Sequence, residues 1–242
     1  MTSGELLTGN AIELAKDLPD ESVDILCTDP PYMLGDAWLY AWLSMEAGRL
    51  LKPGGYLLCL MSSIATDIHL HALRLCPELR FYASLSIGKA PGGVTIWNRN
   101  IIAAHQPVAL FSKGDPIKPA QRVFNFIRSS GGQKAKVWHK WGQDISPFLV
   151  WLEAFCPEGG LVLDPFAGGG TTLVAAKILG REWLGFEIDP QAADRARLRL
   201  SETQTQGKLW GRKELQLDLV YPENEGTPAP TGVPAFEGGE EG

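Results

Sequence analysis

The sequence lacks the features that mark secreted and membrane-spanning proteins. It has no apolar run of 18 residues, so a membrane span is not indicated, and no charged segment followed by an apolar one that would predict a signal peptide. Its four cysteines, Cys27, Cys59, Cys76 and Cys156, are scattered and never form a CxxC pair. This spacing predicts buried, reduced thiols and argues against a disulfide framework or a zinc site. We therefore expect a cytoplasmic protein that binds neither a membrane nor a metal ion.

Basic residues are absent from residue 216 onward, where the chain carries six acidic residues. The part before it, 1–215, is balanced, with 22 basic and 22 acidic residues, so the net charge of −6 comes from the tail. Residues 222–242 are rich in Pro, Gly, Glu and Thr and cannot bury a core, which predicts disorder. We therefore expect one folded domain over 1–215 and an acidic tail over 216–242.

Acidic residues are nearly absent between Arg99 and Gln143, where eight basic residues are accompanied by Asp115 alone. A local basic surface of this kind is typical of a protein with a polyanion partner, and tryptophans lie among these charges. A merely solvated surface is the alternative. The residues that we assign to nucleic-acid contact are Arg99, Lys113, Arg122, Arg128, Lys134, Lys136, His139 and Lys140.

Short apolar runs alternate with helical patterns along most of the chain. The runs that predict strands are 22–27, 54–61, 160–164 and 182–189, with further ones at 81–88 and 107–113. The segments that predict helices are 36–51, about 63–75, 145–156, 170–180 and 190–201. Because the strand runs lack clean polar alternation, the sheet should be covered on both faces. This order predicts a doubly wound, mostly parallel α/β sheet. Within 36–51, Trp38, Trp42 and Met45 share one helical face, which indicates core packing.

The segment DPFAGGGTT, 164–172, places a glycine-rich turn between a predicted strand and a predicted helix. Glycines at this point let the backbone approach a ligand closely, and ligands of α/β sheets lie beyond the carboxyl ends of the strands. The next strand ends at Glu187, roughly 20 residues after the glycines, where dinucleotide-binding folds place an acid on ribose hydroxyls. The turn and the spaced acid together predict a nucleoside ligand, whereas the turn alone would only indicate a tight connection.

The same loop lacks the lysine of a GxxxxGK[ST] motif, which argues against a nucleoside triphosphate. It offers carboxylates where a phosphate would require hydrogen-bond donors. A ligand with an adenosine group and a positive centre fits better, and S-adenosylmethionine, with its sulfonium, is such a ligand.

A second unusual segment, Asp29-Pro30-Pro31-Tyr32, follows the first predicted strand. Proline fixes φ and removes a donor, and the residue before each proline is pushed towards extended geometry. The segment is therefore conformationally rigid, and it carries one carboxylate, carbonyl acceptors and one aromatic face. It predicts a site for a planar group that carries hydrogen-bond donors.

Together, DPPY and DPFAGGGTT resemble the amino-methyltransferases that methylate exocyclic nitrogens of DNA bases. DPPY precedes the glycine loop by about 130 residues, which is similar to the circularly permuted β class of this family. The resemblance extends over about residues 5 to 200 and implies a Rossmann-like methyltransferase fold. It also implies a prokaryotic or phage-encoded enzyme that acts on double-stranded DNA, and it makes a homodimer plausible.

The resemblance assigns roles to individual residues. It implies that Asp29, Pro30, Pro31 and Tyr32 are catalytic, with Asp29 and the Pro30 carbonyl accepting from the target amine and Tyr32 stacking on a base rotated out of the duplex. The methyl group would pass to nitrogen by direct in-line transfer, assisted by placement and electrostatics. The residues that it places at the cofactor are Asn10, Asp29, Gln143, Asp164, Phe166, Ala167, Gly168, Gly170, Thr171, Thr172, Glu187 and Ile188.

Three departures from the family pattern stand out. Gly9-Asn10 replaces the common Gly-Asp, residues 139–144 replace a TQKP motif, and the target-recognition insert near 113–138 is short. A small insert leaves few side chains for reading base edges. The DPPY tetrapeptide favours adenine N6 as the target, with cytosine N4 as the alternative. A non-catalytic, nucleic-acid-binding subunit is the alternative outside the enzymes, and the recognition sequence and the biological role stay open.

Overall fold

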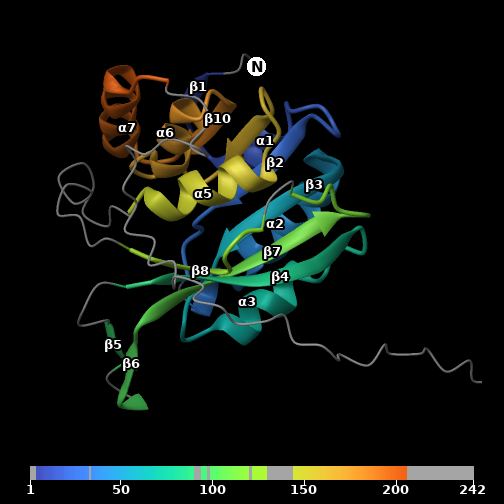
Figure 1. The fold of residues 1–242 in the computed structure, drawn as a ribbon, viewed down its shortest axis with the longest axis vertical. Coiled ribbons are helices and arrows are strands. Elements are labelled where there is room, and N and C mark those ends of the chain that lie inside the picture. Colours follow the sequence, from blue (N-terminus) through green and yellow to red (C-terminus); the bar gives the residue numbers. More distant parts are fainter. Residues whose placement is uncertain are drawn as a thin grey trace, which may run out of the picture.

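A sheet of eight strands runs through the molecule, in the order β1-β10-β9-β2-β3-β7-β4-β8, with helices on both faces (Figure 1). The computed structural model describes residues 4–32, 34–89, 94–96, 99–119, 122–129 and 144–205. The strands of the sheet are β1 (Glu5–Thr8), β2 (Val23–Thr28), β3 (Leu51–Leu60), β4 (Leu79–Gly88), β7 (His105–Lys113), β8 (Phe126–Arg128), β9 (Leu161–Asp164) and β10 (Glu182–Glu187). The helices are α1 (Ala11–Ala15), η1 (Leu34–Asp36), α2 (Ala37–Leu50), α3 (Thr66–Leu73), α5 (Ser146–Phe155), α6 (Thr171–Ile178) and α7 (Pro190–Glu202).

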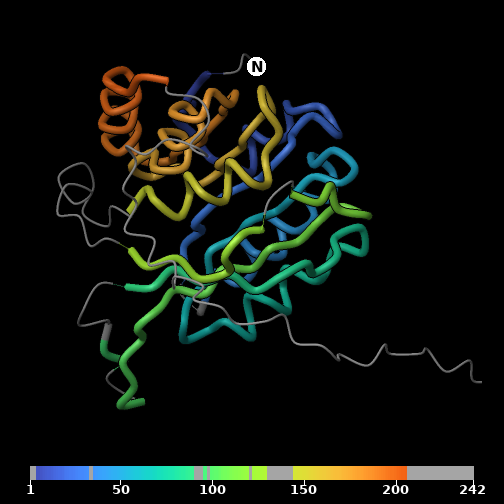
Figure 2. Tube along the Cα trace, viewed as in Figure 1, coloured from blue at the N-terminus to red at the C-terminus, as the bar shows by residue number. Residues whose placement is uncertain are grey.

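The sheet is mostly parallel, as the sequence predicts. Within it, β7 alone is antiparallel to its neighbours β3 and β4, and the other pairings are parallel. A separate two-stranded hairpin, β5 (Val94–Ile96) with β6 (Ile101–Ala103), projects from the body between β4 and β7 (Figure 2). The predicted strands and helices are all present, whereas the short elements β1, α1, β5, β6 and β8 were not predicted.

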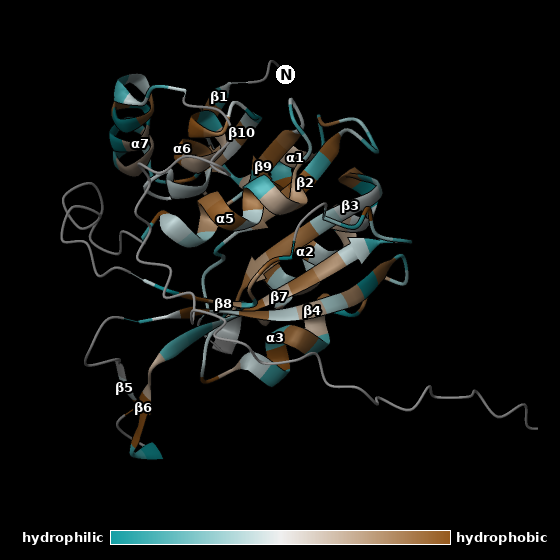
Figure 3. Ribbon diagram, in the orientation of Figure 1, coloured by the Kyte–Doolittle hydropathy of each residue, from teal (hydrophilic) through white to brown (hydrophobic). Residues whose placement is uncertain are grey.

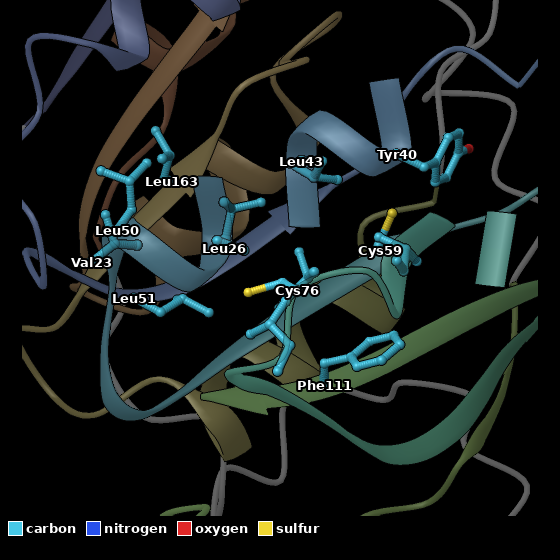
Figure 4. Close-up of a cluster of buried hydrophobic side chains, with 14 of the residues drawn as sticks. Val23, Leu26, Tyr40, Leu43, Leu50, Leu51, Cys59, Cys76, Phe111 and Leu163 are labelled. Carbon is cyan, nitrogen blue, oxygen red and sulfur yellow. The ribbon is translucent and has the colours of Figure 1, made fainter. Parts of the chain in front are cut away.

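Successive residues of the central strands pack on opposite faces of the sheet. Leu26 of β2 belongs to the core under α1, α2 and α3, whereas its neighbours Ile25 and Cys27 belong to the core under α5 and α6. Figure 4 shows the first of these cores, where Leu43 and Leu50 of α2 lie on either side of Leu26 in this view. Because both faces bury apolar side chains, the central strands read as continuous apolar runs, and Figure 3 shows them mainly in brown.

The four cysteines are free and buried, in agreement with the sequence prediction. Within the described part of the chain, none of the helices is long and apolar enough to cross a membrane. The predicted disorder of 222–242 lies outside the described residues.

The parallel strands bring their carboxyl ends to one edge of the sheet. Thr8 at the end of β1 pairs with Glu187 at the end of β10, and Asp164 at the end of β9 pairs with Gly185. Asp29 follows β2 directly, and β2 lies next to β9. The antiparallel β7 begins at the same edge, because its residue Val108 pairs with Leu60 at the end of β3. Segments that are far apart in sequence therefore meet here.

Candidate active site

A pocket of about 800 Å³ opens at this edge, a size within the usual range of ligand sites. The described residues that line it come from β9, β10, α1, α2, α5 and α6 and from the segments that follow β1, β2, β9 and β10. They are Gly9, Asn10, Ala11, Ile12, Asp29, Pro30, Pro31, Tyr32, Trp38, Leu39, Phe148, Asp164, Pro165, Phe166, Ala167, Gly168, Gly169, Thr171, Thr172, Phe186, Glu187 and Ile188. Three of these residues are acidic, and none is Lys or Arg.

The Glu187 carboxylate holds the glycine loop in place. The Gly168 N–H donates to Glu187 Oε2 at 2.7 Å, and the Asp189 N–H donates to Glu187 Oε1 at 2.8 Å. Gly168 adopts φ +51, and Gly170 adopts φ +74 as the N-cap of α6. Both angles lie in the left-handed region that favours glycine, and a Cβ at Gly170 would meet the Cβ of Ala196 at 3.1 Å. The glycines are therefore required by the turn itself.

Asp164 joins the glycine loop to the DPPY segment. Its Oδ1 accepts from the Thr28 hydroxyl at 2.6 Å and from the Phe166 N–H at 3.1 Å. Thr28 directly precedes Asp29, so one buried hydroxyl links the strand ends that carry the two motifs. Burial raises the pKa of Asp164 to about 6, because desolvation outweighs the hydrogen bonds from Thr28, Thr172 and Phe166 that lower it.

Asp29 lies between Asp164 on one side and Lys89 and Gln106 on the other. The pKa of Asp29 is raised to about 7, because burial and the negative charge of Asp164 together outweigh the positive charge of Lys89, which lowers it. The Gln106 side chain on β7 also reaches it, with Nε2 donating to Asp29 Oδ1 at 3.4 Å. A carboxylate held among these groups is a strong hydrogen-bond acceptor when ionised and a neutral group below about pH 7.

Aromatic and aliphatic side chains form the flat walls of the pocket. Tyr32 is 44% exposed and Trp38 is 56% exposed, so both rings present area that a planar ligand could cover. Phe166 packs edge-on against Trp42, with ring centroids 6.0 Å apart. The predicted core packing is therefore correct for Trp42 and wrong for Trp38 and Met45, because the latter two side chains point outward from α2.

The structure brings most of the predicted site residues together. The lining includes all four residues of the DPPY segment and, among the predicted cofactor residues that the structure describes, all except Gly170, which lies behind the loop. Asn10 caps α1, accepting from the Ile12 N–H at 2.9 Å. Gln143 lies outside the described residues. Sequence reasoning missed Trp38, Leu39 and Phe148, which ordinary helical patterns conceal, as well as Lys89 and Gln106.

The predicted nucleic-acid residues fall into three groups. Arg128 ends β8 and pairs with Gly88 at the carboxyl edge, and Arg99 and Arg122 are exposed. Lys134, Lys136, His139 and Lys140 lie outside the described residues. Lys113 lies at the opposite edge of the sheet, at the end of the antiparallel β7, where its Nζ contacts Glu21 at 3.0 Å and Glu78 at 3.6 Å. Its assignment to nucleic acid stays a prediction that the structure does not support, because two carboxylates contact its Nζ and β7 carries it away from the pocket.

The pocket fits S-adenosylmethionine in its chemistry. Asp29 and Asp164 would face a positive centre, Glu187 would accept from ribose hydroxyls, and the apolar walls suit an adenine ring. The absence of Lys and Arg from the described lining argues against a phosphate group. When bound, S-adenosylmethionine supplies an activated methyl group.

Comparisons with known proteins agree with this site. The profile of the N6/N4 DNA methylase family matches residues 23–198. The type II methyltransferase M.BamHI of Bacillus amyloliquefaciens is 27% identical over an alignment of 272 positions, which covers 90% of this chain and 62% of that protein. The structure of the M1.HpyAVI–SAM complex is similar with a TM-score of 0.67 and 22% identity, covering 81% of this chain and 98% of that one. The PvuII DNA methyltransferase, described as cytosine-N4-specific, has a TM-score of 0.70 and 17% identity, covering 82% of this chain and 86% of that one.

At these identities, the two solved structures support the fold, while the family match rests on the sequence. The chain therefore belongs to the N6/N4 family of DNA methylases, which use S-adenosylmethionine as their cofactor.

Proposed function

We propose that this chain is a DNA methyltransferase that transfers the methyl group of S-adenosylmethionine to N6 of an adenine rotated out of the duplex. The observation that carries the proposal is the position of Asp29. Its carboxylate follows β2 and lines the same pocket as the glycine loop, beside the exposed ring of Tyr32. An acceptor and a stacking face thus adjoin a cofactor-sized cavity.

The chemistry of the amine explains why these groups are needed. The exocyclic nitrogen of adenine is a poor nucleophile because its lone pair is delocalised into the ring. Acceptors at its two hydrogens, the Asp29 carboxylate and the Pro30 carbonyl, favour a more tetrahedral nitrogen with an available lone pair. The prolines fix these acceptors, so little reorganisation is required during the reaction. Tyr32 stacks on the extruded base and holds it in place.

Cytosine N4 is the second candidate target. Cytosine presents the same amine beside a ring nitrogen, and the PvuII enzyme of similar fold is described as cytosine-N4-specific. We favour adenine because the tetrapeptide begins with Asp29, as in the adenine-directed members that the sequence resembles.

Nucleoside analysis tests the proposed function. We expect the purified chain, supplied with S-adenosylmethionine labelled in its methyl group, to place label in DNA, and digestion to nucleosides should yield N6-methyl-2′-deoxyadenosine. Label in N4-methyl-2′-deoxycytidine would establish the second candidate. An absence of label from DNA of varied sequence, with cofactor binding intact, would overturn the enzymatic proposal and favour a binding subunit.

We also propose that Arg128 contacts the DNA backbone, because it is exposed at the carboxyl edge of the sheet while Lys113 lies at the opposite edge. Each phosphate contact contributes about 0.9 to the slope of log affinity against log salt. Arg128→Gln should therefore flatten this slope by about one, whereas the matched charge removal Lys113→Gln should leave it unchanged. Fluorescence anisotropy over a series of salt concentrations measures both slopes, and equal slopes for the two variants would contradict the assignment.

A further inference from the structure

Gln106 is the described residue of β7 whose side chain contacts the DPPY segment. It is the second residue of the antiparallel strand and pairs with Ile87 of β4. The next residue, Pro107, accepts from the Met61 N–H at 2.9 Å, which ties the start of β7 to the end of β3. The backbone of Gln106 is thus fixed from both sides, and its half-buried side chain points to the catalytic edge.

The Gln106 amide contacts the first residue of the tetrapeptide. Its Nε2 donates to Asp29 Oδ1 at 3.4 Å. At the other end of the tetrapeptide, the charge of Asp29 and burial raise the pKa of the Tyr32 phenol to about 12. Asp29 and Tyr32 both line the pocket, so the Gln106 amide lies next to a carboxylate of the pocket wall.

A carboxamide offers two N–H donors and one carbonyl acceptor, whereas an ionised carboxylate only accepts. The donation to Asp29 fixes the amide so that its NH₂ group faces the carboxylate. An ionised carboxylate has about four acceptor sites, so Asp29 can accept from more than one donor. The pair therefore presents an acceptor next to a donor.

This order of groups matches one class of base. Adenine and cytosine carry an amine donor next to an unprotonated ring nitrogen, which is an acceptor. At the corresponding ring position, C6 of guanine and C4 of thymine carry a carbonyl acceptor next to a ring N–H. The Asp29 acceptor and the Gln106 donor complement the amine and the ring nitrogen of the first pattern. They mismatch the second pattern, because the carboxylate would face a carbonyl and the amide N–H would face a ring N–H, which leaves all four groups unpaired.

We propose that Gln106 is the specificity-determining residue that restricts this pocket to amino bases: its amide orients the Asp29 carboxylate towards the exocyclic amine and donates its second N–H to the adjacent ring nitrogen. The proposal rests on the proposed function. It adds the residue that recognises the ring nitrogen, which Asp29 and Pro30 do not contact in the proposed reaction.

A single-atom change in the substrate tests the proposed role of Gln106. Duplexes with the mapped target adenine, or with 1-deazaadenine in its place, differ by one ring nitrogen and keep the amine; for a cytosine target the probe is 3-deazacytosine. Wild-type kcat/KM should fall by about 10- to 100-fold on the deaza duplex, the discrimination expected of a specific base contact. Gln106→Ala should be slower on the normal duplex and show little further loss on the deaza duplex. The deaza substitution changes the reactivity of the amine equally for both enzymes, so this effect cancels when the loss of kcat/KM for wild type is compared with that for Gln106→Ala.

Controls separate this role from a structural one. Gln204→Ala, an exposed glutamine beyond α7, should keep the full wild-type penalty, and Gln106→Ala should bind S-adenosylmethionine as the wild type does. Gln106→Ala should also move the acid limb of the rate profile to higher pH, because Asp29 loses a donor that favours its charged form. Gln106→Glu, which fills the same space without a donor, should be no better than Gln106→Ala.

Two outcomes overturn the assignment: a wild-type enzyme that is indifferent to the deaza base, or a Gln106→Ala enzyme that retains the wild-type penalty. Both require an enzyme that is active on the unmodified duplex, so they differ from a failure of the proposed function. If the wild-type chain methylated no DNA, the proposed function would fail and the role of Gln106 would fall with it.

Discussion

Asp29→Asn should reduce the single-turnover rate of methyl transfer by at least about 10²–10³-fold while leaving S-adenosylmethionine affinity within a few-fold of wild type. The substitution keeps the size of the side chain and removes the charged acceptor aimed at the amine. Losing one preorganised hydrogen-bonding group at a reacting centre typically costs this much. The cofactor retains Glu187, Asp164 and the glycine loop, so its affinity should be nearly unchanged.

Rapid-quench measurement with enzyme in excess over DNA isolates the chemical step, and calorimetry measures cofactor affinity. Asp67→Asn is a suitable control, since Asp67 lies in the first turn of α3 and does not line the pocket. A near-normal single-turnover rate for Asp29→Asn would remove the carboxylate from the mechanism. Equal loss of cofactor affinity and rate would mean instead that Asp29 mainly binds the cofactor.

We expect the same carboxylate to limit the activity of the wild-type enzyme at acid pH. Because its pKa is raised to about 7, Asp29 is protonated below that pH and no longer accepts well from an amine. The value of kcat/KM for DNA, measured with the free enzyme as the starting state, should fall as the pH is lowered through about 7. Asp29→Asn should lose this limb.

The stability of the folded protein should change with pH in the direction opposite to kcat/KM. The pKa values of Asp29 and Asp164 are raised above the ordinary 3.8, so the folded protein holds more protons than the unfolded chain between about pH 4 and 7. The free energy of unfolding should therefore decrease as pH rises through this window. Asp29→Asn removes a buried charge and should stabilise the protein at pH 8 by about 1–3 kcal/mol, with a smaller difference at pH 5. Thermal melting at both pH values would thus show that the inactive variant is folded.

The cofactor side of the site could be predicted from sequence because its signals are local. In parallel α/β sheets, strand ends gather at one edge, so Asp164 and Glu187 had to meet once their strands were identified. The conformations of the glycine turn and of the rigid DPPY segment can each be predicted from a few consecutive residues. Only the connection between them, the Thr28 hydroxyl on Asp164, required the lateral order of β2 and β9.

The DNA side could not be predicted in the same way, because its residues depend on the antiparallel strand. Whether a residue of β7 lies near Asp29 or at the far edge depends on strand direction, which an apolar run does not encode. The sequence therefore placed Lys113 in a DNA-binding surface, although β7 carries it to Glu21 and Glu78. For the same reason, Gln106, at the other end of β7, had no local signal. Trp38 was misread because a helical stripe looks alike whether it faces a core or a pocket.

Glu187→Ala should weaken binding of both S-adenosylmethionine and S-adenosylhomocysteine by about 10- to 150-fold, the equivalent of about 1.5–3 kcal/mol for a hydrogen bond to a charged group. Two effects contribute. The variant loses the acceptor proposed for the ribose hydroxyls, and it releases the Gly168 and Asp189 N–H groups that the carboxylate holds. The losses should be equal for the two ligands, because they share the nucleoside and differ at the sulfur.

Glu187→Gln should be nearly as damaging as Glu187→Ala. Both carboxylate oxygens accept from backbone N–H groups, at 2.7 Å and 2.8 Å, and an amide would turn an NH₂ group against one of them. Glu182→Ala provides the matched control, because Glu182 is exposed at the other end of the same strand. Calorimetric titration of all three variants with both ligands, together with melting curves, makes the comparison. A loss confined to S-adenosylmethionine would show that Glu187 acts on the sulfonium charge, and unchanged affinity in a folded Glu187→Ala variant would move the nucleoside out of this part of the pocket.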